Sequence, residues 1–419
     1  MTRFSILCLM LSVTLPSYAA TITVPAGQPT IQAAINAAKN GDVIIVAPGT
    51  YFENINFLGK AISVKSSGGA KVTIIDGGHA NSVVTFSSGE GLKSVLHGFT
   101  IQNGTAGLEG GGIYIDNASP SITGNLVTNN TACNGGAGIA VTFSSAFVQS
   151  NTVTNNSQSG CAGGVGGGGI EVGGAGAAQI LANVVENNSW SSSGGGGISL
   201  WGAGTPTLRN NYIRGNVAYD QGGGIYIVNY SNALIVQNLI YNNTLTEDIN
   251  AGQGAGIYLL VPSGYAGPLL VNNTIVGTSS SVQGSAVYAS GFYDQAMFYN
   301  NLMIGASGTN AVFCDSTYDQ TPPTFTDNDA YSPKGTGLLG TCATQSGANG
   351  NISVNPMFAG ASNFHLRAAS PAINAGDVSA PDIPPLDLIG NPRIVDGNID
   401  MGAYEYQPPA PESVTPVQP

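Results

Sequence analysis

Residues 222–241 read GGGIYIVNYSNALIVQNLIY and join two short phrases that recur along the chain. The first phrase is a glycine run followed by alternating apolar residues, and the second is an apolar stretch that contains an asparagine. Within each phrase the apolar residues alternate with a period of two, which is typical of a β-strand with one buried face. Glycines before the first strand suit tight corners in which φ is positive.

Two columns of residues measure the repeat. The apolar residue after the glycines recurs at intervals of 26 to 32 residues, from Ile113 to Val287, and the asparagine recurs at intervals of 26 to 35 residues, from Asn125 to Asn301. The two columns lengthen and shorten together. The sequence therefore predicts a β-solenoid with one coil per repeat, regular over residues 111–304, whose function lies on a repeated outer face.

The repeated asparagine has two interpretations. Stacked in successive coils, the side-chain amides can pass hydrogen bonds along the solenoid and satisfy polar groups that are costly to bury. Alternatively, asparagine recurs because it is a favourable turn residue. The constancy of the column favours the ladder, and both interpretations make these asparagines structural.

Composition and charge narrow the classes of partner. Only 8% of the 419 residues are charged, against about 25% in ordinary domains, while 42% are hydrophobic. The formal net charge of −12 argues against nucleic acid and anionic membrane surfaces as partners. It also disfavours a polyanionic glycan unless calcium bridges the two.

The chain divides by composition into four parts. Residues 1–20 combine a basic residue, a short apolar run and small residues, which predicts a secretory signal peptide and an exported protein. We expect the solenoid and its N-terminal cap over residues 21–362, a distinct C-terminal module over 363–406, and a proline-rich, disordered tail over 407–419. No later segment is apolar over a length that spans a bilayer.

The remaining four cysteines form two pairs, each separated by 28 residues. Because this is close to the repeat length, Cys133 and Cys161 should lie in the same loop of adjacent coils. The spacing predicts the disulfides Cys133–Cys161 and Cys314–Cys342, as expected of an exported protein. A metal site is the lesser interpretation, since no histidine lies near either pair.

Two segments resemble known families. Residues 30–55, TIQAAINAAKNGDVIIVAPGTYFENI, followed by the coils, resemble the right-handed parallel β-helix proteins of the pectate-lyase-like superfamily. The implied fold is all-β, with a short helix capped by Thr30 that covers the N-terminal end. Residues 363–406 resemble the choice-of-anchor Q module through SPAINAGD, LDLIGNPRIVDG and DMGAYEY; no sorting tag follows them here.

The superfamily resemblance implies a search for a lyase site. Such enzymes need a cationic base and often calcium to neutralise a uronate. From Ser94 to Pro333 the only cationic side chains are Arg209 and Arg214. Arg214 falls in the same column as Glu186 of the preceding coil, so we expect a cross-strand ion pair. Arg209 remains a weak catalytic candidate.

Carboxylates offer a second route to catalysis. Glu247 and Asp248 lie in one long loop and Asp220 in the corresponding loop of the coil before it. These residues could bind calcium or supply an acid–base pair, and the alternative is that they are ordinary solvated acids. The catalytic motifs of polygalacturonases and pectin methylesterases are absent. No cofactor is firmly implied, and Ca²⁺ is the one ion that the pattern leaves open.

Aromatic residues support binding instead. The residue after each core isoleucine should point outward, which gives three tyrosines in successive coils, and exposed aromatic rows can stack on sugar rings. The alternative is a tyrosine ladder that stabilises itself or is covered by a loop. The predicted glycan-binding residues are Tyr226, Tyr258, Tyr288, Trp201, Tyr212 and Tyr241.

The sequence thus favours an exported β-helix protein that binds extracellular or cell-surface polysaccharide through its outer face. One alternative is a polysaccharide lyase or glycoside hydrolase with an atypical site. Another is a structural or adhesive surface protein. The motifs leave open whether the protein is catalytic and whether it is anchored or released.

Overall fold

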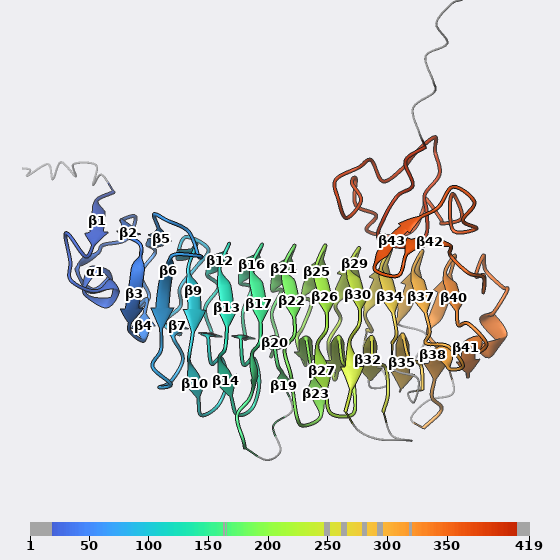
Figure 1. Cartoon of the computed structure of the whole chain (residues 1–419), viewed down its shortest axis with the longest axis horizontal. Coiled ribbons are helices and arrows are strands. Elements are labelled where there is room, and N and C mark those ends of the chain that lie inside the picture. The colour runs from blue at the N-terminus through green and yellow to red at the C-terminus, as the bar shows by residue number, and fades with distance from the viewer. Residues whose placement is uncertain are drawn as a thin grey trace, which may run out of the picture.

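The computed structural model describes residues 19–161, 164, 166–246, 252–260, 266–278, 283–290, 296–317 and 321–408. They form an elongated parallel β-helix, whose strands lie side by side along its length in Figure 1. The predicted all-β solenoid is confirmed. The expected signal peptide falls almost wholly outside the described residues, as does most of the expected tail.

Three long parallel sheets make the walls of the solenoid, and we name them A, B and C. Sheet A contains, in spatial order, β1 (Thr21–Val24), β2 (Val43–Val46), β5 (Ser63–Ser66), β8 (Val95–His97), β12 (Ser121–Thr123), β16 (Phe147–Gln149), β21 (Gln179–Leu181), β25 (Thr207–Arg209), β29 (Leu234–Val236), β33 (Leu269–Val271), β36 (Met297–Tyr299) and β39 (Thr324–Thr326).

Sheet B follows sheet A in each coil, after a turn of two residues in the regular coils. It contains β3 (Gly49–Phe52), β6 (Thr73–Asp76), β9 (Thr100–Gln102), β13 (Leu126–Thr128), β17 (Thr152–Thr154), β22 (Val184–Glu186), β26 (Tyr212–Arg214), β30 (Leu239–Tyr241), β34 (Thr274–Val276), β37 (Leu302–Ile304) and β40 (Asp329–Tyr331).

Sheet C carries the glycine-led phrases. It contains β4 (Ile55–Asn56), β7 (Val84–Phe86), β11 (Ile113–Asp116), β15 (Ile139–Thr142), β20 (Ile170–Gly173), β24 (Ile198–Trp201), β28 (Ile225–Val228), β32 (Ile257–Leu260), β35 (Val287–Ser290), β38 (Asn310–Cys314) and β41 (Thr336–Gly340). The core residues after the glycines pair in register from Ile113 to Val287, as the repeat predicts.

Short strands extend the loops between sheets B and C. They are β10 (Thr105–Ala106), β14 (Thr131–Ala132), β18 (Ser157–Gln158), β19 (Gly166–Gly167), β23 (Gly194–Gly195), β27 (Val217–Ala218) and β31 (Thr244–Leu245). These loops therefore stack coil on coil, and we call the surface that they form the loop side of sheet C.

The predicted asparagine ladder is present at the turn between sheets A and B. The amide of each ladder asparagine donates to the side-chain oxygen of the next at 2.9 to 3.1 Å, from Asn125 to Asn351. A second ladder, which the sequence analysis missed, lies after sheet B with links of 3.0 Å. Its members are Asn130, Asn156, Asn188, Asn216 and Asn243.

The N-terminal end is covered by α1 (Ile31–Ala37). The Thr30 hydroxyl caps this helix by accepting a hydrogen bond from Ala33 N at 3.1 Å. Ile31 and Ile35 are fully buried, and the helix lies against β1, β2 and β4. In Figure 1 it closes the end of the solenoid, as predicted, so the apolar interior is shielded from water there.

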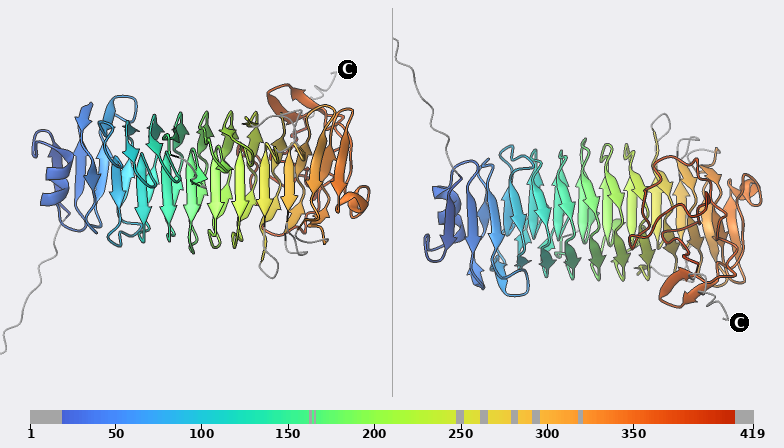
Figure 2. Two further views of the ribbon diagram at one scale, coloured as in Figure 1. Left: turned by 90° about the horizontal axis from the view of Figure 1, so that it is seen from below. Right: turned by 90° about the horizontal axis from the view of Figure 1, so that it is seen from above.

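The C-terminal segment folds back onto the solenoid instead of extending it. After the short helix η1 (Ala343–Gln345), the antiparallel pair β42 (Phe358–Gly360) and β43 (Asn363–Leu366) lies beside sheet B, as Figures 1 and 2 show. Asn300 Nδ2 donates to Asp377 O at 3.0 Å, and Asn300 Oδ1 accepts from Asp377 N at 2.8 Å. Thr274 Oγ1 accepts from Ala403 N at 2.9 Å.

The motifs of this segment converge on a buried ionic cluster. Arg393 is fully buried, and its Nη1 lies 3.9 Å from Glu405 Oε2. Asp400 accepts from Asn374 N and Tyr406 N at 2.8 and 2.6 Å. Because removing one partner would leave a buried charge uncompensated, we regard these residues as structural.

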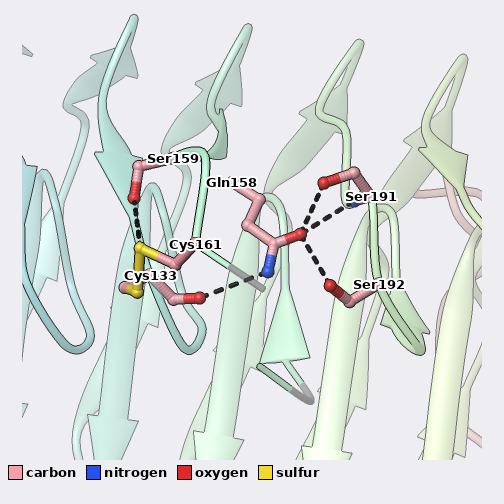
Figure 3. The surroundings of a disulfide bond; sticks show 6 residues. All are labelled: Cys133, Gln158, Ser159, Cys161, Ser191 and Ser192. Atoms are coloured by element: carbon pink, nitrogen blue, oxygen red, sulfur yellow. Dashed lines mark hydrogen bonds between the residues drawn. A yellow bond between two sulfur atoms is a disulfide. The ribbon is translucent and has the colours of Figure 1, made fainter. Parts of the chain in front are cut away.

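Both predicted disulfides form. Cys133–Cys161 and Cys314–Cys342 have Cα separations of 5.4 and 5.7 Å. The first ties two neighbouring coils together on the loop side of sheet C (Figure 3). No helix in the described part of the chain is long and apolar enough to cross a bilayer.

Candidate functional site

The outward tyrosine column of sheet C is present but buried. Tyr226, Tyr258 and Tyr288 stack with ring centroids 5.3 and 5.7 Å apart, and Phe313 continues the stack at 5.4 Å. The three tyrosines are 8%, 5% and 3% exposed, and burial raises the pKa of Tyr226 to about 12. The expectation of an exposed row was wrong here, because the rings cover one another; the alternative of a self-stabilising ladder fits.

Of the two tyrosines predicted on the neighbouring sheet B, Tyr241 is buried and Tyr212 is partly buried. Tyr241 is 8% exposed and packs against Phe364 of the C-terminal segment, with centroids 4.9 Å apart. Tyr212 packs in the same cluster as Tyr404. The sequence analysis could not anticipate this, because the covering residues lie more than 100 positions further along the chain.

Trp201 is the predicted binding residue that remains open to solvent, with 49% of its surface exposed. It is the last residue of β24, where the chain turns from sheet C towards sheet A. Phe143, one residue after β15, and Tyr230, two residues after β28, lie at the same edge and are 55% and 53% exposed. We call these three residues the aromatic edge.

Phe143 and Tyr230 were missed because they fall outside the strand alternation. A signal existed nonetheless, since each is an aromatic residue in a turn flanked by serine or asparagine, where an apolar side chain has no core to enter. Phe143 adopts a left-handed φ of 48°, and its ring lies over the backbone of Gly174 in the next coil. A side chain at Gly174 would collide with that ring.

On the loop side of sheet C, hydrogen bonds connect the loops of neighbouring coils (Figure 3). Gln158 Nε2 donates to Cys133 O at 3.2 Å, while its Oε1 accepts from Ser191 Oγ at 2.6 Å and Ser192 Oγ at 3.0 Å. One glutamine therefore connects the loops of three successive coils. Together with the Cys133–Cys161 disulfide, this network fixes the surface that overlies sheet C.

A hollow of about 390 Å³ opens beside this surface, towards the N-terminal end of the regular coils. Glu109, Tyr114 and Asn134 line it together with Asn81 and Ser82. Burial, with the nearby Asp116 and Glu109 carboxylates, raises the pKa of Tyr114. The hollow thus has a mixed polar and apolar lining with one carboxylate, that of Glu109.

The predicted acid–base residues are not gathered into a described site. Asp220 is partly buried, and its Oδ2 accepts from Ser193 Oγ at 3.2 Å while Oδ1 has no partner among the described residues. Burial raises the pKa of Asp220. Glu247 and Asp248 lie outside the described residues.

The two arginines of the coils have different surroundings. Arg214 Nη2 lies 2.7 Å from Glu186 Oε2 and its Nη1 donates to Tyr241 Oη at 2.8 Å, so the predicted cross-strand ion pair is confirmed. Arg209 lies at the end of β25 on sheet A, and its buried Nε has no partner in the part of the chain described. Its catalytic role stays a prediction.

Metal donors are sparse in the described chain. No group of three or more histidine, cysteine, aspartate or glutamate side chains there is arranged to hold a metal ion. The chain has three histidines, which lie in separate regions: His79 follows β6, His97 ends β8 and His365 is on β43. The four cysteines of the solenoid are all bonded in disulfides.

Comparison with known proteins gives a family and a fold. The family described as periplasmic copper-binding protein (NosD) matches residues 35–263. No curated protein sequence matches the chain. Among solved structures, a pectate lyase, Pel9A, aligns with a TM-score of 0.50 at 14% identity, over 93% of this chain and 96% of that one.

Two further structures align more weakly. XylC in complex with xylose has a TM-score of 0.45 at 12% identity, over 81% of this chain and 87% of that one. The PL6 family polysaccharide lyase Pedsa3628 from Pseudopedobacter saltans has a TM-score of 0.40 at 13% identity, over 91% and 99%. At 14% identity, the likeness to Pel9A is one of fold.

Proposed function

Since the chain belongs to the periplasmic NosD family, we propose that it is an exported protein that binds a neutral polysaccharide along the aromatic edge. The observation that carries this proposal is the exposure of Trp201, Phe143 and Tyr230 on one edge of sheet C. Exposed aromatic rings provide flat apolar faces on which sugar rings stack. Trp201 and Tyr230 belong to neighbouring strands of sheet C, β24 and β28, and Phe143 follows β15, two strands before β24. A row along the stacking direction of the strands suits an extended polymer.

The charge of this face supports a neutral ligand. Asp116 ends β11 at the same strand end as the aromatic edge, whereas the cationic residues of the regular coils, Arg209 and Arg214, are on sheets A and B. A polyuronate would meet like charge there without a compensating base. We therefore do not carry over acidic substrates from proteins of similar fold.

Copper, which the family description names, does not fit the donors of this chain. Copper prefers imidazole, thiolate and thioether ligands. The three histidines lie apart, and the disulfides occupy the four cysteines of the solenoid. We therefore derive no function through copper.

The test is binding of the purified protein to a panel of soluble neutral and acidic polysaccharides by affinity electrophoresis. We expect retardation by at least one neutral glycan, and Trp201→Ala should weaken it at least about tenfold, which corresponds to roughly 1.4 kcal/mol of stacking. Phe52→Ala is the matched control, because Phe52 is 76% exposed but lies on β3 of sheet B.

Unchanged binding by Trp201→Ala, or no binding across the panel, would overturn the proposal. Circular dichroism of each variant separates lost binding from lost folding. Mass spectrometry of the same mixtures tests the alternatives of a lyase or a hydrolase, since unsaturated products indicate the first and hydrated products the second. The choice-of-anchor Q likeness of residues 363–406 and its boundaries likewise stay predictions.

A further inference from the structure

Two neighbouring side chains on the outer face of sheet C are buried without a partner. Glu171 and Ser199 pair directly in the register of β20 and β24. Each lies between two core residues of its strand, so both side chains point outward from the same side of the sheet. Glu171 is 6% exposed and Ser199 is 0% exposed, yet Glu171 Oε2 and Ser199 Oγ have no hydrogen-bond partner among the described residues.

The backbone makes room for the Glu171 carboxylate without binding it. A Cβ atom on Gly135 would lie 1.5 Å from Glu171 Oε2, so glycine is required at this position for the carboxylate to sit where it does. Glu109 Oε2 accepts from Thr142 Oγ1 at 3.2 Å, and Thr142 lies on β15, the strand that pairs with β20. This hydrogen bond brings a second carboxylate over the same outer face, where it raises the pKa of Glu171 further above its usual value than burial alone does.

No cationic side chain compensates these acids. Between Ser94 and Pro333 the sequence has two cationic residues, Arg209 and Arg214, and both lie on other sheets. An unpaired buried carboxylate costs several kcal/mol, and a neighbouring carboxylate adds to that cost. Glu171 is only 6% exposed, and Gly135 of the loop side lies against its carboxylate.

We propose that Glu171 and Ser199, with Glu109, bind one hard divalent cation, for which Ca²⁺ is the best match. All of the side-chain donors are oxygens, which calcium prefers and copper does not. Two carboxylates and a hydroxyl are fewer than the six to eight oxygens that calcium takes, so backbone carbonyls and water complete the shell. The ion links coils that the Cys133–Cys161 disulfide and Gln158 already hold together.

This site stands apart from the polysaccharide proposal, because it lies beneath the loops and the aromatic edge is at the far end of the strands. Its role is to neutralise the acidic interior of the loop side. Glu171 and Ser199 escaped the sequence analysis because they are 28 residues apart in the chain, and only the coil register places the two side chains together.

The experiment titrates CaCl₂ into the purified, chelator-treated protein by isothermal calorimetry and follows the melting temperature in parallel. We expect one ion per chain and a melting temperature that rises with calcium. Glu171→Gln should weaken binding at least about tenfold and abolish the thermal response. Glu186→Gln is the matched control, since Glu186 is also on a strand but is paired with Arg214 at the surface.

Three results would overturn the site. If no heat of binding is measured up to millimolar calcium, the Glu171 carboxyl is neutralised by a proton and not by an ion. Undiminished binding by Glu171→Gln would move the ion to other acids, such as those of residues 247–248. Should Glu171→Gln not fold, Ser199→Ala must weaken calcium binding by itself, and a wild-type affinity in that variant would also contradict the proposal.

Discussion

Buried polar groups at the turn between sheets A and B differ in their hydrogen bonding from those on the outer face of sheet C. At the turn, each interior ladder asparagine both donates to and accepts from its neighbours, so the amides are satisfied by protein. On sheet C, Glu171 and Ser199 are also buried, but each keeps an oxygen without a partner among the described residues. Satisfied polar groups stabilise the solenoid, whereas each buried polar group without a described partner needs an explanation of its own.

Breaking the ladder should have the largest effect. The Asn183 side chain accepts from Asn151 N and Nδ2 and donates to Val148 O and Asn211 Oδ1. Asn183→Ala leaves these groups buried without partners, so we expect a loss of about 3–5 kcal/mol in the free energy of unfolding. Urea denaturation followed by tryptophan fluorescence measures it.

The matched control is Asn232→Ala, at an exposed position of the same solenoid. Surface substitutions usually change stability by less than about 0.5 kcal/mol. Equal effects of the two substitutions would mean that the ladder bonds contribute no more than a solvated turn, and the contrast between the two regions would lose its basis.

The features of the fold that depend on local sequence patterns could be predicted from the sequence. Period and register follow from the glycine-led phrases, because alternation fixes which face each side chain takes. The second ladder could also have been found, since Asn130 and Asn156 each stand five residues after a member of the first, Asn125 and Asn151. The spacing is visible without any structure.

What covers a face is not encoded locally. Tyr241 alternates outward as predicted, yet Phe364 packs on it from more than 100 residues away. Tyr226 is buried because Tyr258 stacks on it at 5.3 Å. Trp201 stays exposed at the strand end. Alternation predicts direction, but exposure depends on loops and on the terminal segment, which only the folded chain brings into contact.

A change in stability of intermediate size is expected at Asp329, a buried group that titrates. Asp329 is fully buried at the start of β40, where Oδ1 accepts from Val354 N at 3.1 Å and Oδ2 has no described partner. Burial raises the pKa of Asp329 to about 7. The folded state therefore holds the proton more tightly than the unfolded state, so stability is full below the unfolded value near pH 4 and is lost as pH rises through about 7.

Asp329→Asn removes this charge while keeping an acceptor for Val354 N. We expect the variant to be more stable than the wild type by roughly 1–3 kcal/mol at pH 8, with the difference shrinking towards pH 4. Melting temperatures across this range measure it, with Asp382→Asn as an exposed control. A wild-type protein that gains stability relative to Asp329→Asn as pH rises would contradict the assignment.

The smallest change in stability is expected for Ser199→Ala on sheet C. Ser199 and Ser231 are both 0% exposed, but Ser231 Oγ donates to Val228 O at 2.8 Å and accepts from Ala203 N at 3.0 Å, whereas Ser199 Oγ has no described partner. In chelator-treated buffer, Ser199→Ala should change stability by less than about 0.5 kcal/mol, while Ser231→Ala should cost about 1–3 kcal/mol. Urea denaturation of both variants compares them directly. Because the two serines match in type and burial, equal losses would show that burial alone, and not hydrogen bonding, separates the two regions.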